Sequence, residues 1–164
     1  MRGGLRGWTE ASGLKGLESL SDLEEIEAKR LKGWIRAVGE IRANEAATMG
    51  RGTLPERLAE VWLRRRGIRF ESQVDLQYAR PDFVLYAVCD LGCVVWRIQG
   101  DYWHSIPERV VTDAAQVGRL FGDAVDGQRI AAVIDLWEKD IYESDGVFER
   151  ALSDGRKGNR NRFK

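Results

Sequence analysis

The sequence has little of the two residue types that most often build metal and disulfide sites. Its 164 residues include only two cysteines, Cys89 and Cys93, and a single histidine, His104. Two cysteines are too few for a disulfide framework or a four-ligand zinc site. We therefore expect both thiols to be buried or half-buried in the apolar stretch that holds them, with a metal or redox role as the alternative.

Long hydrophobic runs are missing too. No apolar stretch reaches the length of a membrane span, and no signal-peptide pattern opens the chain. We therefore expect a cytoplasmic protein with no membrane partner. The hydrophobic content of 43% and the charged content of 32% indicate a globular chain, long enough for one domain with its own core.

An excess of either charge is absent, because 26 basic residues balance 26 acidic ones. Nucleic-acid binding usually comes with a basic excess, so a basic surface would have to be local. Cations gather at Arg64–Arg66 and in the last nine residues, which contain no acid. The tail is either a disordered solubilising end or a phosphate contact, and in the second case Arg160, Arg162 and Lys164 would bind nucleic acid.

Hydrophobic periodicity predicts the order of the elements. An amphipathic helix over about 22–46 follows a flexible glycine-rich start, and residues 47–52 read as a linker. Thr53 and Pro55 begin a second helix, which Gly67 ends. The remaining pattern predicts strands over 68–76, 82–88, 93–99 and 130–137 and helices over 107–122 and 144–153.

This αβββαβα order predicts an α/β (α+β) fold in which helices flank a mixed central sheet. Residues 51–155 would form the domain, with 1–50 as an N-terminal extension that includes one extra helix and 156–164 as a basic tail. Within the third predicted strand, Val94, Trp96 and Ile98 would point to one face, and Val95, Arg97 and Gln99 to the other.

The run Gly100–His104 has the chemistry of a catalytic site. A lone imidazole near acidic residues at the end of a strand can move protons near neutral pH. Tyr102 and Trp103, which precede it, can exclude solvent or stack on a ligand. Gly100 allows a close backbone approach.

Metal-dependent phosphodiester cleavage needs carboxylates for a hard cation such as Mg²⁺, a group that orients water, and a group that assists the leaving oxygen. The candidates are Glu56, Asp82, Gln99, His104 and Asp113. Structural alternatives stay open: Asp82 could cap a turn, while Glu56 and Asp113 could be helix-start charges. Glu60, one turn beyond Glu56, is an alternative acid.

Taken in order, these residues resemble the Vsr-like (very-short-patch-repair) endonuclease family, within the wider PD-(D/E)xK nuclease superfamily. The similarity covers about residues 53–152 and rests on the following segments: Pro55–Leu58 with Gly67–Phe70, Pro81–Leu85, Gly100–His104, Asp113 with Leu120, and Ile134–Ile141. The nearest branch is the EDxHD type found in phage-associated homing endonucleases.

The resemblance implies a restriction-endonuclease-like core and Mg²⁺-dependent DNA cleavage in a bacterial or phage-infected cell, with Mn²⁺ as a substitute. The branch pattern falls on Glu56, Asp82, Gln99 as its variable position, His104 and Asp113. Asp82 would be the central metal ligand, with Glu56 and Asp113 assisting and His104 acting as general base or water positioner. Arg97, Tyr102 and Trp103 would contact nucleic acid.

The chain also departs from the family. It lacks the zinc-binding Cys and His cluster of the repair enzymes, so mismatch-repair specificity is not expected. Arg97 and Gln99 stand where the superfamily has an acid and a lysine. A non-catalytic nucleic-acid-binding module with the same fold is therefore the alternative. A third hypothesis is an interaction protein in which the helix at 22–46 serves as a docking element or forms a homodimer.

Overall fold

The computed structural model describes residues 20–77, 79–100, 115 and 117–158, and the chain divides into two compact units, Met1–Asn44 and Glu45–Lys164. In the first unit, helix α2 (Leu20–Val38) is followed by α3 (Glu40–Ala47), which runs on into the second. The prediction of one continuous helix over 22–46 was wrong, because Gly39 adopts a φ of +90° and separates the two helices.

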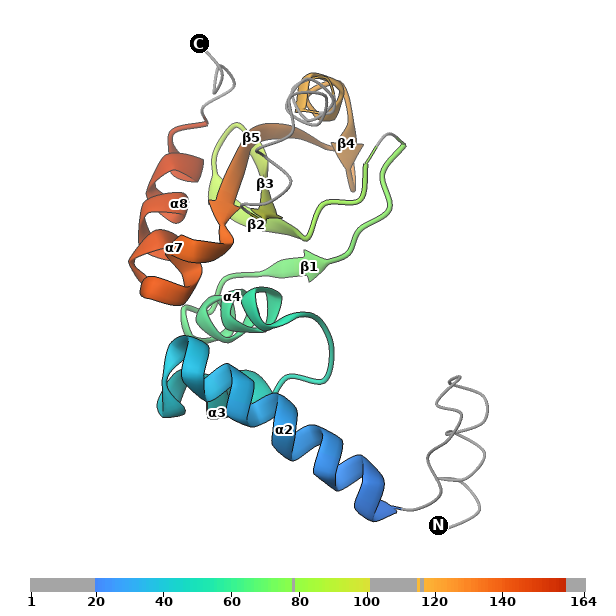
Figure 1. The fold of residues 1–164 in the computed structure, drawn as a ribbon. Coiled ribbons are helices and arrows are strands. Elements are labelled where there is room, and N and C mark those ends of the chain that lie inside the picture. Colours follow the sequence, from blue (N-terminus) through green and yellow to red (C-terminus); the bar gives the residue numbers. More distant parts are fainter. Residues whose placement is uncertain (1–19, 78, 101–114, 116, 159–164) are drawn as a thin grey trace. The chain divides into compact units, whose positions relative to one another are not determined.

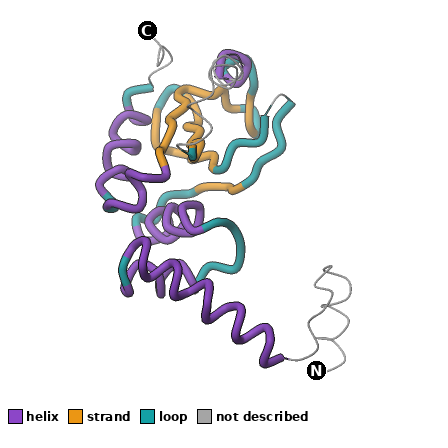
Figure 2. Tube along the Cα trace, viewed as in Figure 1, coloured by secondary structure: helices purple, strands orange, loops and turns teal. Residues whose placement is uncertain are grey.

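The second unit is built on a five-stranded mixed sheet (Figures 1 and 2). Its strand order is β1-β2-β3-β5-β4, in which β1, β2 and β3 pair antiparallel and β5 runs parallel to β3. The strands are β1 (Phe70–Ser72), β2 (Phe83–Cys89), β3 (Gly92–Gln99), β4 (Ala124–Val125) and β5 (Gln128–Trp137). A chain that returns parallel to β3 needs a crossover, and residues 100–123 supply it.

Two strands differ from expectation. The strand predicted over 68–76 is only three residues long, because Gln73 takes a left-handed φ of 53° that ends the ladder. The short strand β4 was not predicted at all. It forms a hairpin with β5 through Asp126 and Gly127, both at positive φ, and an Asp-Gly pair is the usual signal for such a turn.

Helices cover both faces of the sheet. On the Trp96 face, α4 (Leu54–Arg65) and α8 (Gly146–Arg156) pack through the rings of Trp62 and Phe148, whose centroids each lie 6.0 Å from that of Trp96. On the opposite face, Val95 shares a core cluster with Val117 and Leu120, which lie on the helical residues 117–120. The predicted alternation of side chains along β3 is confirmed for Val95 and Trp96.

The protein is therefore a mixed α and β structure with helices flanking a curled central sheet, as predicted at the level of class. The helix α7 (Glu138–Glu143), between β5 and α8, was not expected. Within the ranges that the structure describes, no helix has the length and apolar character needed to cross a membrane.

Candidate active site

Asp82 lies just before β2 and faces the neighbouring strand. Its Oδ2 accepts a hydrogen bond of 2.7 Å from the backbone N–H of Ile98 on β3. Its own carbonyl oxygen accepts a 3.0 Å bond from the backbone N–H of Gln73. These contacts fix the carboxylate at the edge where β2 begins and β3 ends.

Glu56 reaches the same place from the first turn of α4. The amide nitrogen of Gln73 lies 3.2 Å from Glu56 Oε2 and 3.3 Å from Asp82 Oδ1, and donates to both. The other Glu56 oxygen accepts a 2.9 Å bond from the hydroxyl of Thr53, the residue before the helix. Two carboxylates that are distant in sequence therefore share one polar partner.

The loop before α4 is held by Arg57, a residue that the sequence analysis missed. Arg57 is buried, and its guanidinium donates to the backbone carbonyls of Gly52, Ala46 and Met49. Three carbonyls on one planar fork fix the chain that leads into the helix. Glu56, the preceding residue, is positioned as a result.

The environment of Asp82 opposes its charge. Burial raises the pKa of this carboxyl above its ordinary value, and the negative charge of Glu56 raises it further. The Ile98 N–H, the Gln73 amide and the charge of Arg97 act in the opposite direction without cancelling the effect of burial. A carboxylate held in a costly ionised state gains most from a nearby cation.

On β3, Arg97 forms a buried ion pair with Asp135 of β5. The Nε–Oδ1 distance is 2.8 Å, and both side chains are only 9% exposed. The amide of Gln99 donates to the same Asp135 oxygen at 3.3 Å. Asp135 was not predicted as a site residue, although Arg97 and Asp135 are cross-strand partners in the parallel β3–β5 pair.

These strand ends line a pocket of about 290 Å³. It is formed by residues before and at the end of two neighbouring strands: Ala79, Arg80, Pro81, Asp82, Arg97, Ile98 and Gln99. The pocket brings together three residues singled out from the sequence, namely Asp82, Arg97 and Gln99. Arg80 also lines the pocket, and its exposed side chain pairs with Asp75 at 3.4 Å.

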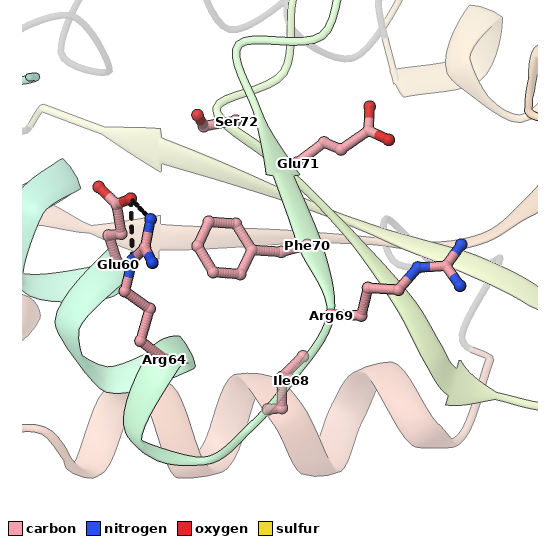
Figure 3. A pocket seen from close by; sticks show the side chains of 7 residues that line it. All are labelled: Glu60, Arg64, Ile68, Arg69, Phe70, Glu71 and Ser72. Carbon is pink, nitrogen blue, oxygen red and sulfur yellow. Dashed lines mark hydrogen bonds and ion pairs between the residues drawn. The ribbon is translucent and has the colours of Figure 1, made fainter.

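A larger, open pocket of about 570 Å³ lies between α4 and β1 (Figure 3). In this view Phe70 points toward the helix, where Glu60 and Arg64 form an ion pair of 2.9 Å, while Arg69 and Glu71 point away from the other side of the strand. Glu60 is therefore committed to Arg64. Of the two alternative acids on α4, Glu56 is the one that shares a partner with Asp82.

The arginine cluster at the C-terminal end of α4 is not a free basic patch. Arg64, Arg65 and Arg66 pair with Glu60, Glu45 and Glu149, respectively. Such exposed pairs contribute little to stability, but they neutralise the local charge. This cluster is a weaker phosphate site than its sequence indicates.

Several predicted residues lie outside the described part of the chain: Tyr102, Trp103, His104, Asp113, Arg160, Arg162 and Lys164. Within the described part, no three His, Cys, Asp or Glu side chains come together as a metal-ligand cluster. The described site thus consists of one acid pair, Glu56 and Asp82, joined by Gln73. Gln73 was missed as well, since an isolated glutamine in a loop carries no signal of its own.

Comparisons of the chain with family models, curated proteins and solved structures find no match. The resemblance to Vsr-like endonucleases therefore stays a prediction.

Proposed function

We propose that the protein is a metal-dependent DNA endonuclease with a restriction-endonuclease-like core, of the Vsr-like, EDxHD type. The observation that carries the proposal is the meeting of Glu56 and Asp82 at one amide, beside the end of the strand that leads to Gly100. The antiparallel β1-β2-β3 meander followed by a parallel β5 supports it as well. The Tyr102–His104 segment follows this strand in the sequence.

The acid pair suits a hard divalent cation. Mg²⁺ typically binds through one or two carboxylates and keeps waters and substrate phosphates as its other ligands. Asp82 and Glu56 would hold the ion, and Gln73, whose amide donates to both carboxylates, would offer its side-chain oxygen as a further ligand. Bound there, Mg²⁺ or Mn²⁺ would supply Lewis-acid polarisation of a phosphate oxygen.

The chain's own groups would supply the rest of the mechanism. The Ile98 N–H orients Asp82, and Thr53 orients Glu56. His104 would take a proton from the attacking water or position that water, and Asp113 would assist. Gln99, held by Asp135, would stand beside the reacting phosphate without adding charge.

A plasmid-cleavage assay with Mg²⁺ tests the proposal, and α4 offers a matched control. Glu56→Gln, Asp82→Asn and His104→Ala should each reduce cleavage strongly, by about 10²-fold or more if they act in the chemical step. Glu60→Gln removes the same charge one turn away and should leave cleavage nearly unchanged, since Glu60 serves Arg64. Equal cleavage by all five proteins would remove the assignment.

A non-catalytic nucleic-acid-binding module is the second candidate. It is favoured by Arg97, because a guanidinium paired to Asp135 stands where the superfamily has an acid. Calorimetry with Mg²⁺ or Mn²⁺ separates the two candidates. Heat of binding that Asp82→Asn abolishes supports the nuclease, whereas DNA binding without any cation binding supports the module.

As an endonuclease the protein would act on DNA in the cytoplasm of a bacterial or phage-infected cell, and pairing through residues 22–46 would let two copies cut two strands. Light scattering on the full chain and on a chain without residues 1–44, which keeps the Ala46 and Met49 carbonyls that Arg57 binds, tests this pairing. A dimer that becomes a monomer on truncation supports it.

A further inference from the structure

We propose that the pocket between Pro81 and Gln99 is a phosphate-binding site in which Arg97 Nη2 is the principal donor. The proposal rests on the proposed function for its ligand, a phosphate oxyanion of a nucleic-acid backbone. It differs from that function in naming a site on β3 that works by hydrogen bonding and charge, independently of a cation. The site would hold a phosphate beside the Glu56–Asp82 pair.

Only one side of the Arg97 guanidinium forms hydrogen bonds to described residues. Its Nε donates to Asp135, whereas Nη2 is buried and has no hydrogen-bond partner among the residues that the structure describes. Arg97 as a whole is only 7% exposed. A buried, charged donor without a partner costs more free energy than an ordinary hydrogen bond contributes. Such groups are rare in native structures, so the unpartnered Nη2 indicates a ligand that the free protein lacks.

The pocket that Arg97 lines can accept one. Its volume of about 290 Å³ exceeds the roughly 30 Å³ that one water occupies in the liquid, so a phosphate with several waters would fit. The planar fork of Arg97 suits a tetrahedral oxyanion, and the ion pair with Asp135 holds the fork in place. Arg80 lines the same pocket, but its charge is shared with Asp75 at 3.4 Å, so Arg97 is the principal cation of the site.

The pocket also has an acidic side, since Asp82 lines it. An anion next to Asp82 would be repelled unless a positive group stood between them. Arg97 lines the same pocket, and its positive charge, which lowers the pKa of Asp82 against the effect of burial, would offset this repulsion. A phosphate bound to Nη2 would thus sit on the cationic side of Asp82.

Binding to a short fluorescent DNA duplex in EDTA, followed by anisotropy across a salt series, tests the site without any cleavage. The variant is Arg97→Met with Asp135→Asn, which removes the guanidinium without leaving a buried carboxylate unpaired. We expect about tenfold weaker binding and a salt dependence reduced by about one phosphate contact. Arg129→Met removes the same charge at the start of β5, about 20 Å away along the strand, and should change the affinity less.

A second variant guards against misfolding. Arg97→Lys keeps a cation against Asp135 but has no second nitrogen for the pocket, and it should show the same loss if its thermal unfolding matches that of the wild type. A duplex with neutral methylphosphonate linkages should bind equally weakly to wild type and variants. Calorimetry with inorganic phosphate shows whether the pocket also takes a free phosphate. If inorganic phosphate gives a heat of binding that the Arg97 variants lack, the site binds free phosphate. If only binding to the duplex depends on Arg97, the ligand is a phosphate of the DNA backbone.

Equal affinity and equal salt dependence for wild type and both Arg97 variants would overturn the phosphate site. This outcome is separate from failure of the nuclease proposal. A chain that binds through Arg97 and never cuts refutes only the nuclease. A chain that cuts with Mg²⁺ but binds DNA equally well without Arg97 refutes only the phosphate site.

Discussion

The ionised carboxylate of Asp82 lies in an electrostatically unfavourable environment. It is half-buried, and burial together with the negative charge of Glu56 raises its pKa despite the hydrogen bonds that it accepts. Groups kept in unfavourable surroundings are typical of functional sites, where local stability is given up for chemistry. A purely structural turn cap would instead stabilise the fold.

This contrast predicts the effect of Asp82→Asn on stability. The asparagine oxygen can still accept from the Ile98 N–H, while the buried charge and its repulsion by Glu56 disappear. The free energy of unfolding at pH 7 should therefore stay level or rise by about 0.5–2 kcal/mol. Urea unfolding measures it, with Asp90→Asn in the exposed β2–β3 turn as the control. A clear loss of stability would make Asp82 a structural residue.

The two thiols differ in a way that the sequence did not specify. Cys93 is fully buried, its Sγ lies 3.5 Å from the Arg129 carbonyl oxygen, and burial raises its pKa, whereas Cys89 is half-buried. Because the thiolate is the reactive form, a native-state thiol reagent at pH 8 should modify Cys89 well before Cys93. Mass spectrometry of single Cys→Ser variants measures both rates, and equal rates would refute the burial of Cys93.

The raised pKa of Cys93 also fixes the sign of a pH effect. The folded state favours the protonated thiol, so its contribution is fully present below the unfolded pKa of about 8.5 and is lost as the pH rises through the folded pKa. Unfolding free energies from pH 7 to pH 10 should therefore fall less steeply for Cys93→Ala than for the wild type. Identical slopes would contradict this.

At the level of elements, the sequence predicted the pieces that patterning controls. The run Ile130–Ile134 indicated a buried strand, and Thr53 with Pro55 indicated the start of α4, as the structure confirms. The hydrophobic pattern carries less information about the backbone conformation of single residues. The break at Gly39 and the early end of β1 at Gln73 were therefore missed. Both depend on a single residue at positive φ.

The candidate site was only partly predictable for a similar reason. Asp82 and Glu56 could be named from residue type and position, and the structure brings them together. Gln73, Asp135 and Arg57 could not, because a glutamine, an aspartate or an arginine gains its role from a neighbour that is distant in sequence. Only the strand register and the loop path supply that neighbour.

The packing of β3 against β5 requires a residue without a side chain at position 92. A Cβ there would lie 2.1 Å from the Arg129 carbonyl oxygen of β5, and the φ of +152° adds strain. Gly92→Ala should cost about 3 kcal/mol or more of stability, since backbone meets backbone and neither strand can yield. Gly118→Ala, in a helix with open space, should be neutral or stabilising by up to about 1 kcal/mol. Thermal unfolding compares the two, and a harmless Gly92→Ala would contradict the observed β3–β5 packing.

At the scale of the whole molecule, the elements that build the site all belong to one unit. The sheet, α4, α7, α8 and the aromatic cluster lie within Glu45–Lys164. A chain that starts at Glu45 should therefore unfold in one cooperative transition, with a urea midpoint close to that of the full chain. A truncated chain without a cooperative transition would show that the first unit is needed for the fold.

The central claim is that Glu56 and Asp82, brought together by the fold and joined by Gln73, form a cation site. Anomalous diffraction from crystals soaked in Mn²⁺ tests this most directly. We expect one strong peak within about 2.0–2.3 Å of an oxygen of each carboxylate, with the Gln73 amide no longer donating to both. Strong Mn²⁺ peaks elsewhere, with none between these two acids, would contradict it.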